Sequence, residues 1–308
     1  MEKFNVDDLI AKGLVRAKTY TEGQFSGLRV LKYHGRVFWD NMWKQDPRLK
    51  ECRGIVVDQD DNVILHPFTK IFNRGENKTD LAMDRVVIEV EKINGFMAGA
   101  TVYKGKWLVS TTGTLDSDYA RLAEEVIQFY NPYPSLDIGY TQEGAMWRSL
   151  DLMFEICHPS DPHIVEQEPG AYLIGARCRG TGRMLSESAL DGICPVGWKR
   201  PAWRKCLFAD TVEAAKSCKH EGFVVRDVDS GELLLKIKSP HYLAKKFFMR
   251  GGIKKCDLIW DTDRVKKSVD EEYYPLLDYI RANYTKEAWL ALQEQERRLK
   301  IEAYLEGD

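Results

Sequence analysis

The sequence lacks several features that would place the chain in a specialised class. It has no run of about 18 apolar residues, so it predicts no membrane-spanning helix. Its first ten residues lack the apolar segment of a secretion signal. The formal net charge is only −2, from 45 basic and 47 acidic residues. No global field therefore attracts a polyanion, and any nucleic acid would have to be held by a local basic patch.

The cysteines follow neither a disulfide nor a zinc pattern. There are seven, an odd number, and no two of them form a Cys-x-x-Cys pair. This spacing is typical of reduced thiols and argues against a disulfide framework or a zinc site. We therefore expect a cytoplasmic protein, in the host cytoplasm if the chain is encoded by a phage.

The composition and the paired apolar runs predict a globular α+β protein. The chain has 308 residues with 44% hydrophobic and 11% aromatic content, which suits one large domain with or without a small appendage. Turn residues separate paired apolar runs and predict three hairpins, at residues 55–65, 100–110 and 222–237. Consecutive hairpins build antiparallel sheet, and no regular strand–helix alternation indicates a parallel fold.

Helical patterns interrupt these hairpins and dominate the end of the chain. Apolar spacing predicts helices at residues 117–130 and 211–218. After residue 250 the sequence indicates two further helices, at residues 268–284 and 285–305. We therefore predict a large domain over residues 1–250 and a small helical C-terminal domain over residues 251–308.

The most informative motif is Lys92-Ile93-Asn94-Gly95, which follows the strand-like run 86–91. A lysine leaving a buried strand, with an oxygen ligand and a glycine close behind it, suggests an amine nucleophile beside a phosphate. Lysine has an ordinary pKa of about 10.4, so the attacking amine must be deprotonated by its surroundings. Burial and neighbouring cations both favour the neutral form.

Other residues along the chain would supply those surroundings. Cationic side chains at Arg53, Lys70, Lys236 and Lys238, with a divalent metal, would favour a neutral Lys92 and also bind a triphosphate. The oxygens of Glu221 and Asn94 are ligands that Mg²⁺ or Mn²⁺ accepts. Gly95 and Gly222 would let the backbone approach a ligand closely. Together these groups could form and break a lysine–nucleotide phosphoramidate.

Six short motifs follow one another between residues 50 and 247, at residues 51–55, 68–73, 92–95, 153–159, 221–225 and 235–239. In identity and order they resemble the covalent nucleotidyltransferase superfamily, and within it the phage-type RNA ligase 1 family. The resemblance implies two antiparallel sheets around a nucleotide cleft. It also implies an ATP-dependent RNA ligase that joins 5′-phosphate and 3′-hydroxyl ends, and a role in RNA repair.

The same resemblance implies roles for individual residues. Lys92 would carry AMP taken from ATP and pass it to the RNA 5′-phosphate, with Mg²⁺ or Mn²⁺ as cofactor. Metal would bind at Glu221 and Asn94. The nucleotide would contact residues from five of the six motifs, together with Tyr242 just after the last: Arg53, Lys70, Phe72, Asn94, Gly95, Glu155, Lys236, Lys238 and Tyr242. Since no kinase or phosphatase motif occurs, a separate protein would heal damaged RNA ends.

Two positions depart from the family pattern. Asn94 stands where the family has aspartate, an exchange that fungal and plant tRNA ligases share. Thr112 stands where the family often has lysine, so one cationic contact would be missing. The C-terminal region is also shorter than in the T-even phage enzyme, in which the larger region is associated with tRNA. The sequence therefore does not identify the natural RNA.

Three alternatives stay open from sequence. A DNA ligase or a capping guanylyltransferase would share the motif order. Both, however, carry a β-barrel module after the last of these motifs, the one at residues 235–239. Only 70 residues follow Lys238 here (308 − 238), and they read as helix. The third alternative is an inactive homologue that binds RNA ends, suggested by Asn94 and Thr112.

Overall fold

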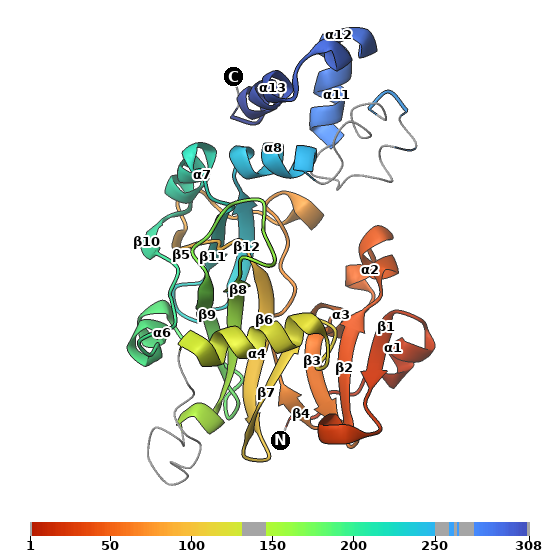
Figure 1. Ribbon diagram of the computed structural model, residues 1–308, viewed down its shortest axis with the longest axis vertical. Helices are drawn as coiled ribbons and strands as arrows, with labels where there is room; N and C mark the ends of the chain where they lie inside the picture. The colour runs from red at the N-terminus through yellow and green to blue at the C-terminus, as the bar shows by residue number, and fades with distance from the viewer. Residues whose placement is uncertain (1, 131–145, 250–258, 262–263, 265–273, 307–308) are drawn as a thin grey trace.

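The computed structural model describes residues 2–130, 146–249, 259–261, 264 and 274–306. Within them the strands form three antiparallel sheets of four strands each (Figure 1). The fold is therefore α+β with antiparallel sheets, as the sequence predicts. None of the helices in this described part is both long enough and apolar enough to cross a membrane.

Of the N-terminal sheet, only the hairpin at residues 55–65 was predicted from the sequence. Its strands lie in chain order: β1 (Val15–Thr19), β2 (Leu28–Tyr33), β3 (Arg53–Asp58) and β4 (Val63–Leu65). Three short helices accompany it: α1 (Asp7–Ala11), α2 (Gly35–Trp39) and α3 (Arg48–Glu51). Leu28, Val30 and Leu65 of this sheet pack against Leu108 and Leu115, which joins it to the rest of the fold. The sheet is thus part of one continuous body.

The other two sheets carry or adjoin four of the six motifs, at residues 92–95, 153–159, 221–225 and 235–239, whereas the motif at residues 51–55 enters β3 of the N-terminal sheet. One has the order β10 (Trp203–Leu207), β5 (Val86–Glu91), β11 (Gly222–Arg226), β12 (Leu233–Lys238). The other has the order β7 (Lys106–Thr111), β6 (Phe96–Tyr103), β8 (Leu150–Cys157), β9 (Gly170–Cys178). The predicted hairpins are confirmed, with Val57 opposite Val63, Tyr103 opposite Lys106 and Phe223 opposite Ile237.

Helices cover the outer faces of these sheets. Helix α4 (Asp118–Tyr130) packs Ala123, Val126 and Ile127 on the β6–β8 face, which confirms the predicted helix there (Figure 1). Short α6 (Glu187–Ile193) flanks the same sheet. Helix α7 (Phe208–Ser217) begins three residues before the predicted start, because the Phe208 ring is buried against the other sheet and Asp210 accepts a hydrogen bond from the Leu207 N–H.

The C-terminal region is helical, as predicted, but its last helix is interrupted. Helix α8 (Pro240–Met249) contacts α7, and the chain continues through α11 (Tyr274–Asn283). The predicted helix over residues 285–305 is two helices, α12 (Lys286–Ala291) and α13 (Glu294–Glu306). They separate at Leu292, where the Gln293 N–H donates to Glu296 Oε2. The domain boundary near residue 250 lies outside the described residues and stays a prediction.

Candidate active site

A cavity of about 800 Å³ lies where the three sheets meet. Its walls come from β2 and β3, from the turn between β5 and β6, from β8, from β11 and β12, and from the loop between β7 and α4. Eight of the predicted site residues line it: Arg53, Lys70, Lys92, Gly95, Glu155, Glu221, Lys236 and Lys238. The structure thus brings together residues that are up to 185 positions apart (238 − 53).

Lys92 leaves the end of β5 and enters this cavity. Its backbone N–H bonds the carbonyl of Gly222 at 2.9 Å, which ties the motif to β11. The following turn is tight, because a Cβ on Gly95 would lie 2.3 Å from the Ile156 carbonyl oxygen. The side chain is 21% exposed, and its Nζ lies 2.9 Å from Glu221 Oε2. The amine is therefore held at a fixed place with access to the cavity.

The charge state of Lys92 depends on the carboxylates beside it. Burial favours the neutral amine, but the carboxylates of Glu221 and Glu155 outweigh it and raise the pKa of Lys92. The protein groups alone therefore favour an ammonium at Lys92, and the expectation of a neutral amine, which included a divalent metal, stays a prediction. Arg53 opposes the carboxylates only weakly. The Lys92 amine can lose its proton only after the charge around it changes.

The two carboxylates that flank Lys92 differ from one another. Burial raises the pKa of Glu155, against the opposing effect of Lys92. Its Oε1 accepts the Gly95 N–H at 3.1 Å, which fixes it beside the nucleophile motif. Burial also acts on Glu221, but there the charge of Lys92 prevails and the pKa is lowered. Glu221 is therefore the ionised partner of the amine.

The remaining predicted cations, Arg53, Lys70, Lys236 and Lys238, line the same cavity. Burial, together with Lys238, Lys70 and other cations, lowers the pKa of Lys236 to about 7. Burial is also the main cause that lowers the pKa of Lys70 to about 8, against the opposing effect of Glu76. The cations around Lys236 repel one another, and an anion such as a triphosphate would relieve the repulsion.

Asn94 does not point an oxygen at the cavity. Its Oδ1 accepts the Val165 N–H at 3.0 Å, and its Nδ2 donates to Glu221 Oε2 at 2.7 Å. The side chain is 5% exposed and connects Glu221 to the loop after β8. The amide oxygen already accepts one hydrogen bond and the amide nitrogen is a donor, so these contacts lend no support to metal binding at Asn94, which stays a prediction.

Phe72 and Tyr242 are core aromatics rather than cavity walls. Phe72 is 7% exposed and packs in the N-terminal core beside Trp43, where Lys70 lies over its ring at 4.4 Å. Tyr242 is 5% exposed, with Lys238 over its ring at 5.8 Å. Neither lines the large cavity. Each ring lies under a lysine that does, and the predicted direct contact with the nucleotide stays a prediction.

The N-terminal sheet adds two cavity residues that sequence reasoning missed, Lys32 and Tyr33. Lys32 lies opposite Arg53 in the β2–β3 register and beside Gly113, next to Thr112. The repeated apolar residues of 28–31 were the signal for this strand. Lys32 thus places a cation near position 112, and this cation comes from a different sheet.

Comparison with known proteins adds a fold-level assignment. No protein-family model matches the chain, and no curated protein sequence matches it. Among solved structures, an archaeal ATP-dependent RNA ligase aligns with a TM-score of 0.56 at 17% identity, over 97% of this chain and 74% of that one. A second form of an archaeal ATP-dependent RNA ligase gives 0.54 at 17%, over 96% and 77%. The fold is that of an ATP-dependent ligase.

A candidate ATP-dependent DNA ligase from Aquifex aeolicus is similar to the same extent. Its TM-score is 0.55 at 15% identity, over 98% of this chain and 71% of that one. These likenesses establish the ligase fold alone, and they do not distinguish RNA from DNA as substrate. The choice between nucleic acids has to be argued from the residues of the site.

A divalent cation fits the acidic side of this ligase fold. Glu155 and Glu221 both line the cavity, and magnesium is commonly held by one or two carboxylates with substrate phosphates and water. Among the described residues no group of three histidine, cysteine or acidic side chains forms a site made by protein alone. The donor set therefore suits a metal that arrives with a nucleotide better than a permanently bound one.

Proposed function

We propose that this chain is an ATP-dependent RNA ligase that joins 5′-phosphate and 3′-hydroxyl ends through a lysyl-AMP at Lys92. The observation that carries the proposal is the position of Lys92. Its amine enters the cavity beside Glu221 and Glu155, and faces a wall that holds Arg53, Lys236 and Lys238. An amine between carboxylates and phosphate-binding cations is suited to attack a nucleotide α-phosphate.

In the first step Lys92 Nζ would form a bond to the α-phosphorus of ATP, and the bond to the bridging oxygen would break. Pyrophosphate leaves with the electron pair, and the amine loses a proton. A divalent cation at the carboxylates would offset their charge and so favour the neutral amine. Lys236 and Lys238 would stabilise the negative charge that accumulates on the α-phosphate. Glu155 would orient the ribose from its position under Gly95.

The next two steps would use the same cations. The RNA 5′-phosphate would attack the phosphorus of the lysyl-AMP, which releases Lys92 and forms an RNA-adenylate. A 3′-hydroxyl would then attack the 5′-phosphate of that adenylate and release AMP. We assign the end-healing chemistry to a separate protein and the biological role to RNA repair. The metal would be Mg²⁺ or Mn²⁺.

RNA is favoured over the alternatives by the region after β12. In the part of the chain that the structure describes after Lys238, the elements are helices α8 and α11 to α13. A DNA ligase or a capping guanylyltransferase is expected to continue there with a β-barrel. DNA ligation remains the second candidate because a candidate DNA ligase matches the fold equally well.

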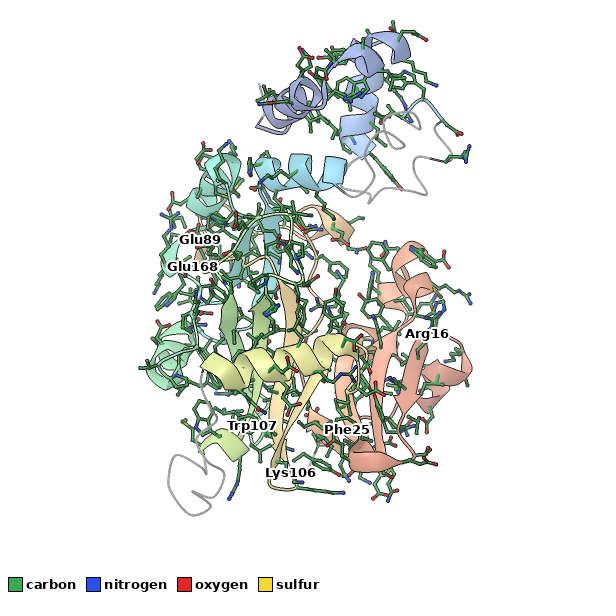
Figure 2. The ribbon with its side chains drawn as sticks, in the orientation of Figure 1. Arg16, Phe25, Glu89, Lys106, Trp107 and Glu168 are labelled. Carbon is green, nitrogen blue, oxygen red and sulfur yellow. The ribbon has the colours of Figure 1, made fainter. Side chains whose placement is uncertain are left out.

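Radioactive labelling tests the proposal directly. The protein mixed with α-labelled ATP and either metal should acquire an acid-labile, alkali-stable label on the peptide that contains Lys92. Lys92→Ala should abolish the label, whereas Lys106→Ala, on the exposed tip of the β6–β7 hairpin, should keep it (Figure 2). Label on the Lys92→Ala protein, or label from GTP in place of ATP, would overturn the assignment.

Substrate choice needs a second assay. The labelled protein should transfer AMP to a 5′-phosphorylated RNA strand and seal it to a 3′-hydroxyl strand. The same strands made of DNA serve as the matched control. Sealing of nicked DNA alone would favour the second candidate. Absence of both label and sealing in the wild-type protein would instead indicate an inactive homologue that binds RNA ends.

A further inference from the structure

Tyr119 lines the nucleotide cavity, and the proposed reaction gives it no role. It stands in the first turn of helix α4 and is 47% exposed. Gly113, Thr114 and Ser117, from the loop that precedes the helix, also line the cavity. The ring is thus open to a ligand at the wall of the candidate active site.

Contacts with the loop after β8 hold this ring in one orientation. The Tyr119 hydroxyl donates to Asp161 Oδ1 at 3.0 Å, and Asp161 Oδ2 lies 2.9 Å from His163 Nε2. Further along this loop, the Val165 N–H donates to Asn94 Oδ1 in the nucleophile motif. The loop that contacts the nucleophile motif therefore also positions Tyr119, and little side-chain freedom would be lost when a ligand binds to the ring.

The Tyr119 ring keeps at least one face free for stacking. Phe96 contacts it with 4.9 Å between the ring centroids and 87° between the ring planes. Such a perpendicular contact covers at most one face of the tyrosine ring. Among the described residues no other aromatic ring contacts Tyr119. A flat ligand group can therefore stack on the open face.

The charges around Tyr119 favour a neutral ligand group over a phosphate. Asp161 accepts the hydroxyl hydrogen bond, and Asp116 and Asp118 come just before Tyr119 in the chain. Each of these carboxylates is paired with a basic side chain, so those basic groups are not free to hold a phosphate. A nucleobase is flat and uncharged, and every base can stack on an aromatic ring. A nucleobase is therefore the ligand group that suits Tyr119.

The position of the ring separates it from the base of ATP. On β6, Met97 lies opposite Glu155, so these two side chains share one face of the sheet, where Glu155 would orient the ribose. Phe96 is on the other face, because side chains alternate along a strand, and Tyr119 packs against Phe96. A base on Tyr119 would therefore come from a second nucleotide, and the RNA supplies one.

We propose that Tyr119 stacks on the base of the 5′-phosphorylated end nucleotide of the RNA strand and so positions this end for AMP transfer. The inference rests on the proposed function, because it takes RNA as the second substrate. The base at the 3′-hydroxyl end has the same chemistry. The 5′ end is favoured because it occupies the cavity in both RNA steps, whereas the 3′-hydroxyl enters only in the last.

Two variants of Tyr119 separate the effect of the ring from that of its hydroxyl. Purified lysyl-AMP protein is titrated with a 5′-phosphorylated RNA strand, and AMP transfer is followed in single turnover. Tyr119→Ala should raise the half-saturating RNA concentration about tenfold, within the range found when a base-stacking ring is removed. Tyr119→Phe keeps the ring and should raise it less than about threefold. Trp203→Ala is the control, because Trp203 is 36% exposed on β10 and does not line the cavity.

An ATP titration distinguishes RNA from ATP as the stacking partner. In Tyr119→Ala the KM for ATP in lysyl-AMP formation should change less than about twofold. A rise in this KM without a change in the RNA titration would place the ring beside the base of ATP and overturn the proposal. Equal RNA titrations for Tyr119→Ala and Trp203→Ala would also overturn it. Thermal unfolding of each variant controls for a general loss of structure.

Removal of the base itself gives a readout that a purely structural role of Tyr119 would not change. With a strand that lacks the base of its 5′-terminal nucleotide, the half-saturating concentration for the wild-type protein should rise about tenfold, and that for Tyr119→Ala should rise no further. Independent losses in the two proteins would reject stacking on this base. If only a 3′-hydroxyl strand without its terminal base shows such coupling in the sealing step, the 3′ end is the occupant and the 5′ assignment is wrong.

A binding measurement tests the stacking even if no lysyl-AMP forms. The whole unlabelled protein is titrated into a 5′-phosphorylated RNA strand whose first base is 2-aminopurine, a base whose fluorescence is quenched by stacking. The wild-type protein and Tyr119→Phe should quench it, whereas Tyr119→Ala should not. This pattern would support the stacking even though the ligase reaction had failed. Absence of quenching by the wild-type protein, or equal quenching by Tyr119→Ala, would overturn the stacking even if the ligase reaction were established.

Discussion

The amide nitrogen of Asn94 lies 2.7 Å from Glu221 Oε2, the same oxygen that lies 2.9 Å from the Lys92 amine. Glu221 therefore receives two donors on one oxygen, and one of them is anchored to the Val165 backbone through Asn94 Oδ1. An aspartate at position 94 has no donor to offer and would place a second negative charge against Glu221. These contacts explain why asparagine suits position 94 better than aspartate.

Asn94→Asp should slow lysyl-AMP formation about tenfold to a hundredfold, the range found when groups that orient a metal ligand are removed. The rate constant is measured in single turnover with excess ATP at several metal concentrations. Asn94→Ala is the control, because it removes the donor without adding charge and should be less harmful. A variant Asn94→Asp that is faster than wild type would show that an anionic oxygen ligand is preferred, contrary to the observed contacts.

Two glycines at the site have no room for a side chain. A Cβ on Gly222 would lie 2.0 Å from the Ile237 carbonyl oxygen, at φ +126°, and one on Gly95 would lie 2.3 Å from the Ile156 carbonyl oxygen. Either Gly→Ala exchange should lower the free energy of unfolding by ~3 kcal/mol or more, since backbone has to move. Denaturant unfolding measures this loss.

Gly192→Ala is the matched control for these exchanges. Gly192 lies in helix α6, and its Cβ would meet nothing within 4 Å. Alanine is the better helix former, so the exchange should stabilise the protein by roughly 0.5–1 kcal/mol. Unchanged stability in Gly95→Ala or Gly222→Ala would mean that the turns beside Lys92 are looser than the structure shows.

Sequence predicted the site residues better than it predicted their charges. The motifs at Lys92, Glu155 and Glu221 were expected in one site because their identity and order resemble a known superfamily; strand periodicity is local information and does not place distant residues together. The pKa of Lys92 could not be foreseen, because it depends on which neighbour is closest. Glu221 lies against the amine, whereas the cations line other walls of the cavity. Only distances in the folded chain decide between those effects.

The fold shows the same division between local and long-range information. The hairpin at residues 100–110 follows from a Lys-Gly-Lys turn, and it was predicted correctly. Strands β1 and β2 of the N-terminal sheet were missed because β2 and β3 are separated by helices rather than by a recognisable turn, and their pairing is long-range. The break at Leu292 was missed because no glycine or proline marks it in the sequence.

Lys236 should make ATP binding depend on pH. Burial and neighbouring cations lower its pKa to about 7 in the empty site, so at pH 8 most of these amines are neutral. A bound phosphate favours the charged form and raises that pKa, and the protein then takes up a proton. Below about pH 6 the amine is already charged and uptake should vanish. Calorimetry at pH 8 in two buffers of different ionisation enthalpy measures the uptake.

Lys236→Arg is the control for this titration, because arginine stays charged at every pH used and takes up no proton. The sign for stability is opposite to that of a salt-bridged lysine. The lowered pKa means that the unfolded chain binds more protons between pH 7 and 10, so this residue alone makes stability rise with pH there. Buffer-independent heats with the wild-type protein would contradict the assignment of Lys236 as a phosphate-binding amine.

Tyr20 links the N-terminal sheet to the cavity wall. Its hydroxyl accepts the Leu115 N–H at 2.8 Å and donates to Asp116 at 3.2 Å, and Lys18 also pairs with Asp116. The loop held in this way includes Thr112, whose backbone would be 2.9 Å from a Cβ on Gly54. The N-terminal sheet thus fixes a wall of the nucleotide cavity.

Tyr20→Phe should lower the free energy of unfolding by about 1–3 kcal/mol, because the buried Leu115 N–H loses its acceptor. It should also raise the KM for ATP in lysyl-AMP formation, since the loosened loop carries Thr111 to Thr114 of the cavity wall. Tyr103→Phe is the control. Tyr103 packs against the same apolar cluster, and its hydroxyl has no hydrogen-bond partner among the described residues. If both variants keep wild-type stability and KM, the N-terminal sheet does not order the cavity through Tyr20.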